Sequence, residues 1–262
     1  MNPFVIILLS ITQAITEFLP ISSSAHLLLL PWVFGFDNPG LAFDAALHIG
    51  TALALLVFFA KDFWRLFVKR DRLLLYILAA SVPAALFGFF GDKLIEEYLH
   101  VSYYAPLVVG IGMVFFSIVL YLVDKYAALK SEVKDITLWQ SLVVGFAQAL
   151  ALIPGTSRSG VTITAGLWLG LKREDAARFS FLLATPISLG AGLYKAYDIF
   201  TDPSSSNVSS LGLVLAIILT FVVGLVVIKW LLSYLKSHSM LIFVIYRIII
   251  GLGVISLWLI RR

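Results

Sequence analysis

Long apolar stretches recur along this chain, and they restrict its fold more than any other feature. Six of them are close to the roughly 20 residues that a helix needs to cross a bilayer. They are residues 41–60, 73–90, 103–123, 179–197, 211–228 and 241–260. The sequence is 61% hydrophobic and 13% charged, whereas soluble domains average roughly 45–50% apolar and about 25% charged residues. We therefore predict an all-α polytopic membrane protein with six spanning helices.

The rest of the composition narrows the function. The net charge of +4 is small and forms no basic stripe on a polar domain, so we expect no nucleic acid partner. The chain has no cysteine, which excludes disulfides and thiolate chemistry. Its 262 residues leave no room for a soluble domain beside the predicted spans. A single membrane domain over residues 1–262 is expected.

Two further apolar regions, residues 4–34 and 138–169, are longer than a span and are interrupted in the middle. Each interruption contains a proline, small hydroxyl residues and a charge. The Lys- and Arg-rich segment 61–72 is predicted to be cytoplasmic, and the segments 91–102 and 198–210, in which acids outnumber bases, are predicted to be external. Counting spans from these assignments, region 138–169 must enter and leave the membrane on the same side, and region 4–34 must do so if the N-terminus is outside. Both are therefore predicted to be re-entrant helical hairpins.

The two halves of the chain follow the same order of elements. Gln13 and Pro20 lie in the first interrupted region as Gln148 and Pro154 lie in the second, and three spans follow each region. An odd number of spans inverts the second copy. We predict two inverted-topology repeats, at about residues 1–125 and about 137–262 (the first and second repeat). In such proteins the broken segments meet near the midplane and build a polar site between the repeats.

The first interruption begins with two polar residues on one helix face. Gln13 and Glu17 are spaced i, i+4, and Pro20 ends or kinks the helix after them. A glutamate in this position can serve as a metal ligand or as a general base. The alternative is a purely structural ion pair between Glu17 and Arg158.

Ser22, Ser23, Ser24 and His26 follow. One of the serines can cap a helix that begins near Ala25, which would place His26 in its first turn. A helix start binds anions through its free N–H groups. His26 can act as base, acid or nucleophile, and a serine beside it can be an activated nucleophile. Serines near a proline also commonly do no more than repair backbone hydrogen bonds, so that reading stays open for each of them.

The second interruption reads PGTSRSG and has a different set of groups. Arg158 offers a planar fork that suits phosphate oxygens. Glycine allows the backbone to approach a ligand closely. A cation, clustered hydroxyls and free N–H groups in one loop are typical of an oxyanion receptor. The candidate substrate-binding residues of both interruptions are Gln13, Ser22, Ser24, Thr156, Ser157, Ser159, Gly160 and Thr162.

Few other charged residues fall in the predicted spans. Asp44 is interpreted as the cap of the span that it begins, and His48, one turn later, as structural. Arg247 is expected to pair with a carboxylate or to reach the membrane surface, and it is a weak candidate for a second phosphate contact.

At the two interruptions the chain resembles the undecaprenyl-diphosphate phosphatase family, also called the bacitracin-resistance protein. QAITEFLPISSSAHL is similar to its first motif and PGTSRSGVT to its second, and the hydrophobic pattern is similar over essentially the whole chain. The resemblance implies hydrolysis of undecaprenyl diphosphate to undecaprenyl phosphate and inorganic phosphate. Matched position by position, it implies functional roles for Glu17, Ser23, His26 and Arg158 and, less directly, Gln13, Ser157 and Thr162.

This chain departs from the family pattern at two places. Gln13 stands where many members have Glu, and Ser24-Ala25 stands where Thr-Gly is common. Gln cannot be a base, so Glu17 would carry any acidic role alone. The absence of Gly at Ala25 favours a helix start over a tight turn.

The resemblance also implies a cofactor and a location. A divalent cation, Mg²⁺ or Ca²⁺, is expected near Glu17 with help from Gln13. The expected partners are undecaprenyl diphosphate, other long isoprenyl diphosphates and the lipid bilayer, with a homodimer left open. The expected place is the bacterial cytoplasmic (inner) membrane, with the site facing the outer side. The alternative function is a lipid-phosphate flippase or transporter, which needs an anion site but not the Glu17–Ser23–His26 cluster.

Overall fold

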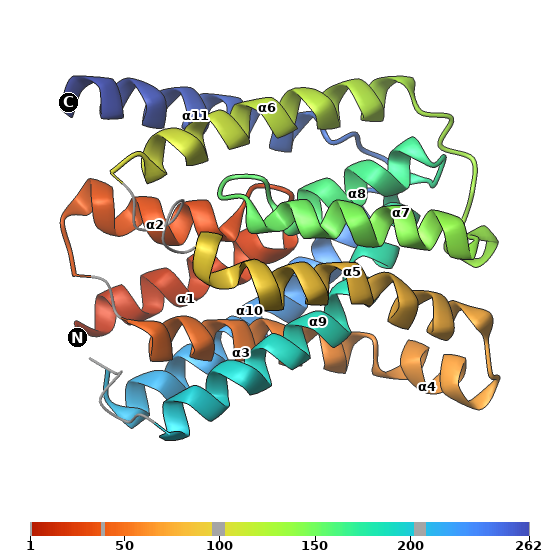
Figure 1. The fold of residues 1–262 in the computed structure, drawn as a ribbon, viewed down its shortest axis with the longest axis horizontal. Coiled ribbons are helices and arrows are strands. Elements are labelled where there is room, and N and C mark those ends of the chain that lie inside the picture. Colours follow the sequence, from red (N-terminus) through yellow and green to blue (C-terminus); the bar gives the residue numbers. More distant parts are fainter. Residues whose placement is uncertain (1, 38–39, 96–102, 202–207, 262) are drawn as a thin grey trace.

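The computed structural model describes residues 2–37, 40–95, 103–201 and 208–261, and helices make up most of this part of the chain (Figure 1). Six helices are long and apolar enough to cross a membrane, which confirms the predicted all-α polytopic fold. Their bounds are α3 Leu41–Phe58, α5 Arg72–Ile95, α6 Ala105–Tyr126, α9 Arg173–Thr201, α10 Ser210–Tyr234 and α11 Leu241–Arg261. Parts of the predicted external segments, residues 96–102 and 202–207, lie outside the described residues.

The helix ends differ from the expected ones where polar residues support an extra turn. Helix α9 begins at Arg173, six residues before the predicted span, and carries Glu174 and Asp175 in its first turn. Acidic side chains at that end interact favourably with the helix dipole. The basic segment 61–72 also contains a helix that was not predicted, α4 Ala60–Val68. Its exposed Trp64 and Phe67 alternate with charged residues, a pattern typical of a helix at a membrane surface.

Each interrupted region consists of two helices joined by a short break. The first comprises α1 Pro3–Phe18 and α2 Ser23–Phe34, and the second comprises α7 Leu138–Ala149, the short 3-10 helix η3 Leu150–Leu152 and α8 Arg158–Trp168. In Figure 1 the α1–α2 pair opens toward the end of the molecule that holds the N-terminus, and the α7–α8 pair opens toward the opposite end. The tips of the two pairs meet in the middle of the molecule.

The two breaks share an unusual backbone. Ser22 and Ser157 precede α2 and α8, and both have a positive φ, 74° and 70°. A positive φ is unfavourable for a residue with a side chain and concentrates at functional sites. The helix starts at Ser23 and Arg158 are 135 positions apart (158 minus 23), and so are Gln13 and Gln148 (148 minus 13). The inverted repeats themselves stay a prediction.

Close helix packing surrounds the breaks. Helix α1 packs on α10 and α7 packs on α5, while α3 contacts both α9 and α10. The contact between α7 and α5 depends on Gly145, where a Cβ atom would collide with the carbonyl of Ala80. Small residues allow this close approach between membrane helices. The breaks are therefore enclosed by helices, which protects their free backbone groups from lipid.

Candidate active site

An ion pair joins the two breaks at the centre of the molecule. Arg158, the first residue of α8, places its Nη2 atom 2.8 Å from Oε1 of Glu17, near the end of α1. The side chains are only 17% and 9% exposed. Nη1 of Arg158 donates to the hydroxyl of Ser188 on α9 at 2.9 Å. The structure thus brings together an acid and a base that lie 141 positions apart in the sequence.

The second oxygen of Glu17 accepts from two side chains of the first repeat. The Ser23 hydroxyl donates to Oε2 at 2.5 Å and the Gln13 amide donates to the same atom at 3.1 Å. A short hydrogen bond of this kind is typical of a hydroxyl on a carboxylate. Of the two activating partners that the sequence left open for Ser23, Glu17 is the one that the structure places in contact.

His26 lies in the first turn of α2, as predicted, but its ring is engaged elsewhere. Its Nδ1 atom is 2.7 Å from the carbonyl of Ser22, so that nitrogen carries the proton. Its Nε2 atom is 2.7 Å from the hydroxyl of Tyr246, and the two rings stack with 5.7 Å between their centroids. The helix begins at Ser23, two residues before the expected start. Ser22 occupies the cap position without a side-chain cap bond.

In the second break most hydroxyls hold the backbone. Ser157 caps α8 by accepting from the N–H of Gly160 at 3.1 Å. Ser159 donates to the carbonyl of Leu19 at 2.9 Å and so ties the second break to the first. Thr162 donates to the carbonyl of Arg158 at 2.8 Å. These bonds match the structural role that membrane hydroxyls commonly have near a helix break.

Two predicted binding residues stand apart from these bonds. Ser24 is exposed, and its hydroxyl is 3.3 Å from that of Ser22. Thr156 is fully buried, and its Oγ1 atom has no hydrogen-bond partner within the described residues. Substrate contacts of Ser24 and Thr156 stay a prediction.

The expectation that Arg247 pairs with a carboxylate or reaches the membrane surface was wrong. Arg247 is completely buried in α11, and within the described ranges no carboxylate lies at ion-pair distance from it. It neither pairs with an acid nor reaches the surface; it donates to backbone carbonyls instead. Asp44 lies in the first turn of α3, whose cap residue is Gly40.

Three side chains near the centre were not predicted as site residues: His48, Ser188 and Tyr246. His48 was interpreted as structural, yet its Nδ1 atom is 3.4 Å from the Gln13 amide nitrogen. Ser188 binds Arg158 and Tyr246 binds His26. None of the three lies in either interrupted motif, so the reasoning from the motifs did not identify them.

The residues can hold a divalent cation only in part. In the described portion of the chain, no group of three His, Cys, Asp or Glu side chains is placed to bind a metal. The Oε1 atom of Gln13 is buried without a hydrogen-bond partner in those same residues and adjoins the Glu17 carboxylate. Mg²⁺ commonly takes one or two protein oxygens and completes its shell with substrate phosphates and water. The donors fit a cation of that kind, whose site a diphosphate would complete.

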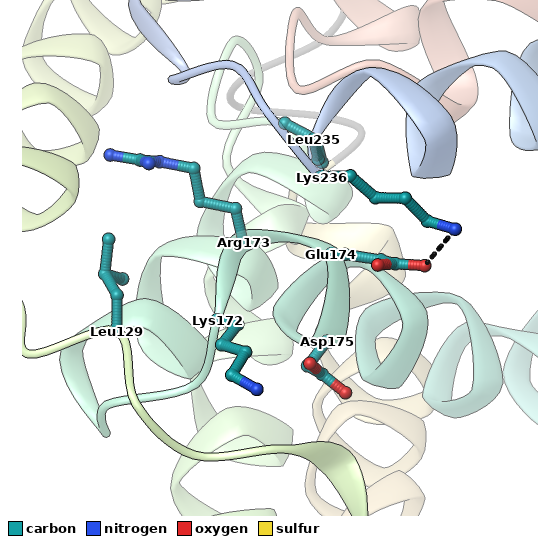
Figure 2. A pocket seen from close by; sticks show the side chains of 7 residues that line it. All are labelled: Leu129, Lys172, Arg173, Glu174, Asp175, Leu235 and Lys236. Atoms are coloured by element: carbon teal, nitrogen blue, oxygen red, sulfur yellow. Dashed lines mark ion pairs between the residues drawn. The ribbon is translucent and has the colours of Figure 1, made fainter.

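A second polar cluster lies at the other end of α8 and α9, around a cavity of about 240 Å³ (Figure 2). Each cation there has an acidic partner: Lys172 with Glu132 at 2.7 Å, Arg173 with Asp124 at 2.6 Å, and Lys236 with Glu174 at 3.5 Å. The hydrogen bonds from Lys134 and Lys172 lower the pKa of Glu132 to about 2. Because its charges are balanced, this cluster is a connection between helix ends rather than an anion site.

Comparison with known proteins supports the resemblance. The family model of the bacitracin resistance protein BacA matches residues 6–253. A protein of Desulforudis audaxviator named undecaprenyl-diphosphatase is 44% identical over 100% of both chains. Proteins with the same name from Pelotomaculum thermopropionicum and Corynebacterium glutamicum are each 42% identical, over 98% and 96% of this chain and 97% and 89% of their own. With its two central breaks and this match, the chain belongs to the bacitracin resistance protein BacA family.

Proposed function

We propose that this protein hydrolyses undecaprenyl diphosphate to undecaprenyl phosphate and inorganic phosphate, and so recycles the envelope carrier lipid in a bacterial membrane. The observation that carries the proposal is the contact of Ser23 with Glu17, which is itself paired with Arg158. These groups supply a hydroxyl, a base and a cation in a buried site. The curated relatives that carry the name undecaprenyl-diphosphatase support the same reaction.

Ser23 is the proposed nucleophile and Glu17 its base. The diphosphate competes with Glu17 for the guanidinium of Arg158, which frees the carboxylate to take the Ser23 proton. The Ser23 oxygen then forms a bond to the terminal phosphorus as the bridging P–O bond breaks and undecaprenyl phosphate leaves. Water hydrolyses the resulting phosphoserine and releases inorganic phosphate. Arg158 stabilises the negative charge on the transferred group in both steps.

The contacts of the two ring nitrogens of His26 define its proposed role. Because Nδ1 donates to the Ser22 carbonyl, Nε2 is the nitrogen that exchanges a proton, and it faces Tyr246 rather than Ser23. We assign His26 to proton transfer with water in the second step rather than to the activation of Ser23.

A divalent cation, Mg²⁺ or Ca²⁺, is part of the proposal. Glu17 and the free Oε1 atom of Gln13 would hold it together with the substrate. When bound, it would neutralise charge on the diphosphate oxygens. Gln13, Ser22, Ser24, Thr156, Ser157, Ser159, Gly160 and Thr162 complete the proposed binding region.

The proposed location is the bacterial cytoplasmic membrane, with the site open to the outer side. The basic helix α4 and the ion-pair cluster beside α9 lie at the end of the molecule opposite to the N-terminus, which supports a cytoplasmic face there (Figure 1).

Other long isoprenyl diphosphates are also proposed substrates. The polar groups of the site can contact the diphosphate headgroup, which all of these lipids share. The homodimer stays a prediction. The carrier alternative is not proposed, since the relatives and the Ser23–Glu17 contact favour a hydrolase.

The test is release of phosphate from undecaprenyl diphosphate by the purified protein in detergent, with and without EDTA. Ser23→Ala is expected to lower kcat by several orders of magnitude, because loss of a nucleophilic serine leaves only the catalysis that the binding groups supply. Ser81→Ala is the matched control, because the Ser81 hydroxyl donates only to the carbonyl of Ile77 in its own helix. Substrate labelled in the terminal phosphate should label the wild type at Ser23 after rapid acid quenching. Full activity in Ser23→Ala would refute the assignment of the nucleophile, and no release by folded wild type would refute the function.

A further inference from the structure

Arg247 is a buried cation that the proposed chemistry does not use. It lies about two turns into α11 and is 0% exposed. A charged residue at that depth costs at least about 2.5 kcal/mol unless it has partners. In the described part of the chain no carboxylate neutralises it, so its partners must be of another kind.

The partners of Arg247 are backbone carbonyls of both breaks. Its Nη1 atom donates to Pro20 at 3.2 Å, and its Nη2 atom donates to Gly155 and Thr156 at 2.9 Å each. Pro20 follows α1, and the other two residues follow η3. All three carbonyls lie in the non-helical breaks, beyond the cap residues Leu19 and Ile153. A backbone carbonyl outside a helix at membrane depth must find a donor within the protein. One guanidinium therefore satisfies carbonyls of two breaks that belong to different halves of the chain.

The surrounding backbone leaves just enough room for this guanidinium. A Cβ atom at Gly160 would lie 2.9 Å from Nη1 of Arg247. Gly155 has φ +84°, and a Cβ atom there would collide with the carbonyl of Val109. Gly160 thus lets α8 approach Arg247, and Gly155 lets the second break approach α6, which explains on structural grounds why both positions of PGTSRSG are glycine.

We propose that Arg247 is a positioning residue for the phosphatase reaction. It holds the two breaks together through their backbone carbonyls and thereby sets the distance between Ser23 and Glu17 at one break and Arg158 at the other. The N-terminal ends of α2 and α8, with their free N–H groups, then remain available for the diphosphate. In carriers built from broken helices, unwound carbonyls of this kind coordinate a mobile cation; here the cation is fixed to the chain.

The first arm of the test compares the kcat and KM of three variants, in each of which an arginine of α11 is replaced. Arg247→Met is expected to lower kcat at least 100-fold with KM within threefold, because a displacement of about 1 Å between reacting groups can cost that much. Arg247→Lys keeps a cation and hydrogen-bond donors and should lose less than tenfold. Arg261→Met is the control, since Arg261 is an exposed residue whose contacts are with Trp32. This arm depends on the proposed function; a kcat for Arg247→Met within threefold of the wild type would overturn the assignment.

The second arm measures the separation of the two breaks and does not require turnover. The chain has no cysteine, so spin labels can be placed at Val33→Cys in α2 and Leu150→Cys in η3, which are 40% and 45% exposed. Double electron–electron resonance should give one narrow distance distribution in the wild type and in Arg247→Lys, and a broad one in Arg247→Met. If Arg247→Met does not fold, Arg247→Lys carries the test, with a narrow distance distribution and a loss of kcat below tenfold as the expected result. A broad distribution with wild-type kcat, or a narrow one with kcat more than 100-fold lower, would refute the proposal.

Discussion

The ion pair between Glu17 and Arg158 allows a quantitative test of how the two breaks support each other. The pair is buried and separated by 2.8 Å. Removing one partner of a buried pair leaves an uncompensated charge and typically costs about 3–5 kcal/mol, whereas removing both costs much less than the sum of the two single removals. Glu17→Gln and Arg158→Met should therefore each lower the free energy of unfolding by about 3 kcal/mol. The double variant should lose about 3 kcal/mol rather than about 6, which corresponds to a coupling of about 3 kcal/mol.

The assay is equilibrium unfolding in mixed micelles with increasing SDS, followed by circular dichroism. All three variants are expected to be inactive, so stability rather than turnover carries the information. A control cycle uses Lys172 and Glu132, a pair whose side chains are 47% and 40% exposed and whose coupling should lie within experimental error. Additive losses at Glu17 and Arg158, with a coupling near zero, would refute the reasoning that the two breaks stabilise each other through this pair.

Three more predictions follow from single contacts. Tyr246→Phe removes the hydroxyl that binds His26 Nε2 and should lower kcat about tenfold with little change in the melting temperature; an unchanged kcat would exclude a role for this contact. Gly155→Ala should lower the free energy of unfolding by at least about 2 kcal/mol, because φ is +84° and a Cβ would strike the Val109 carbonyl, whereas Gly253→Ala, at an open position, should cost less than about 1 kcal/mol in SDS unfolding. The pKa of Glu132 is lowered from 4.5 to about 2, so its contribution to stability is present above pH 4.5 and is lost as the pH falls toward 2. Glu132→Gln should flatten the dependence of the melting temperature on pH in that window and leave this dependence unchanged at pH 6–8. A dependence on acid pH equal to that of the wild type would contradict this prediction.

Much of the architecture could be predicted because hydrophobicity in a membrane chain is a local property. Each of the six spanning helices overlaps a predicted apolar stretch, and both interrupted regions are broken helix pairs. The length of a stretch and the presence of Pro20 or Pro154 are sufficient for these predictions, since lipid requires every backbone group to be satisfied within a helix or inside the protein. The amphipathic helix α4 was missed because its charged residues were used to assign the loop to one side of the membrane.

The site shows where local patterns end. Glu17, Ser23 and Arg158 could be predicted because they interrupt apolar runs, where a polar residue must have a reason. Their connections were predictable only in part. The ion pair of Glu17 with Arg158 was one of the alternatives, but the sequence left Glu17 and His26 both open as the partner of Ser23, and Arg247 binds carbonyls rather than a carboxylate. Tyr246, Ser188 and His48 lie in helices far along the chain from the residues that they contact, and only packing brings them to the breaks.

The amino-acid sequence by itself determined that this chain spans a membrane, where its helices are broken, and which residue types the breaks contain. Those properties depend on the transfer of successive residues from water to lipid, which neighbours along the chain decide. The tertiary structure alone decided which carboxylate accepts the hydrogen bond from Ser23, which serines hold the backbone, and which groups accept hydrogen bonds from Arg247. Hydrogen bonds and ion pairs act over about 3 Å, and several of these contacts join residues more than a hundred positions apart, such as Glu17 with Arg158 and Pro20 with Arg247.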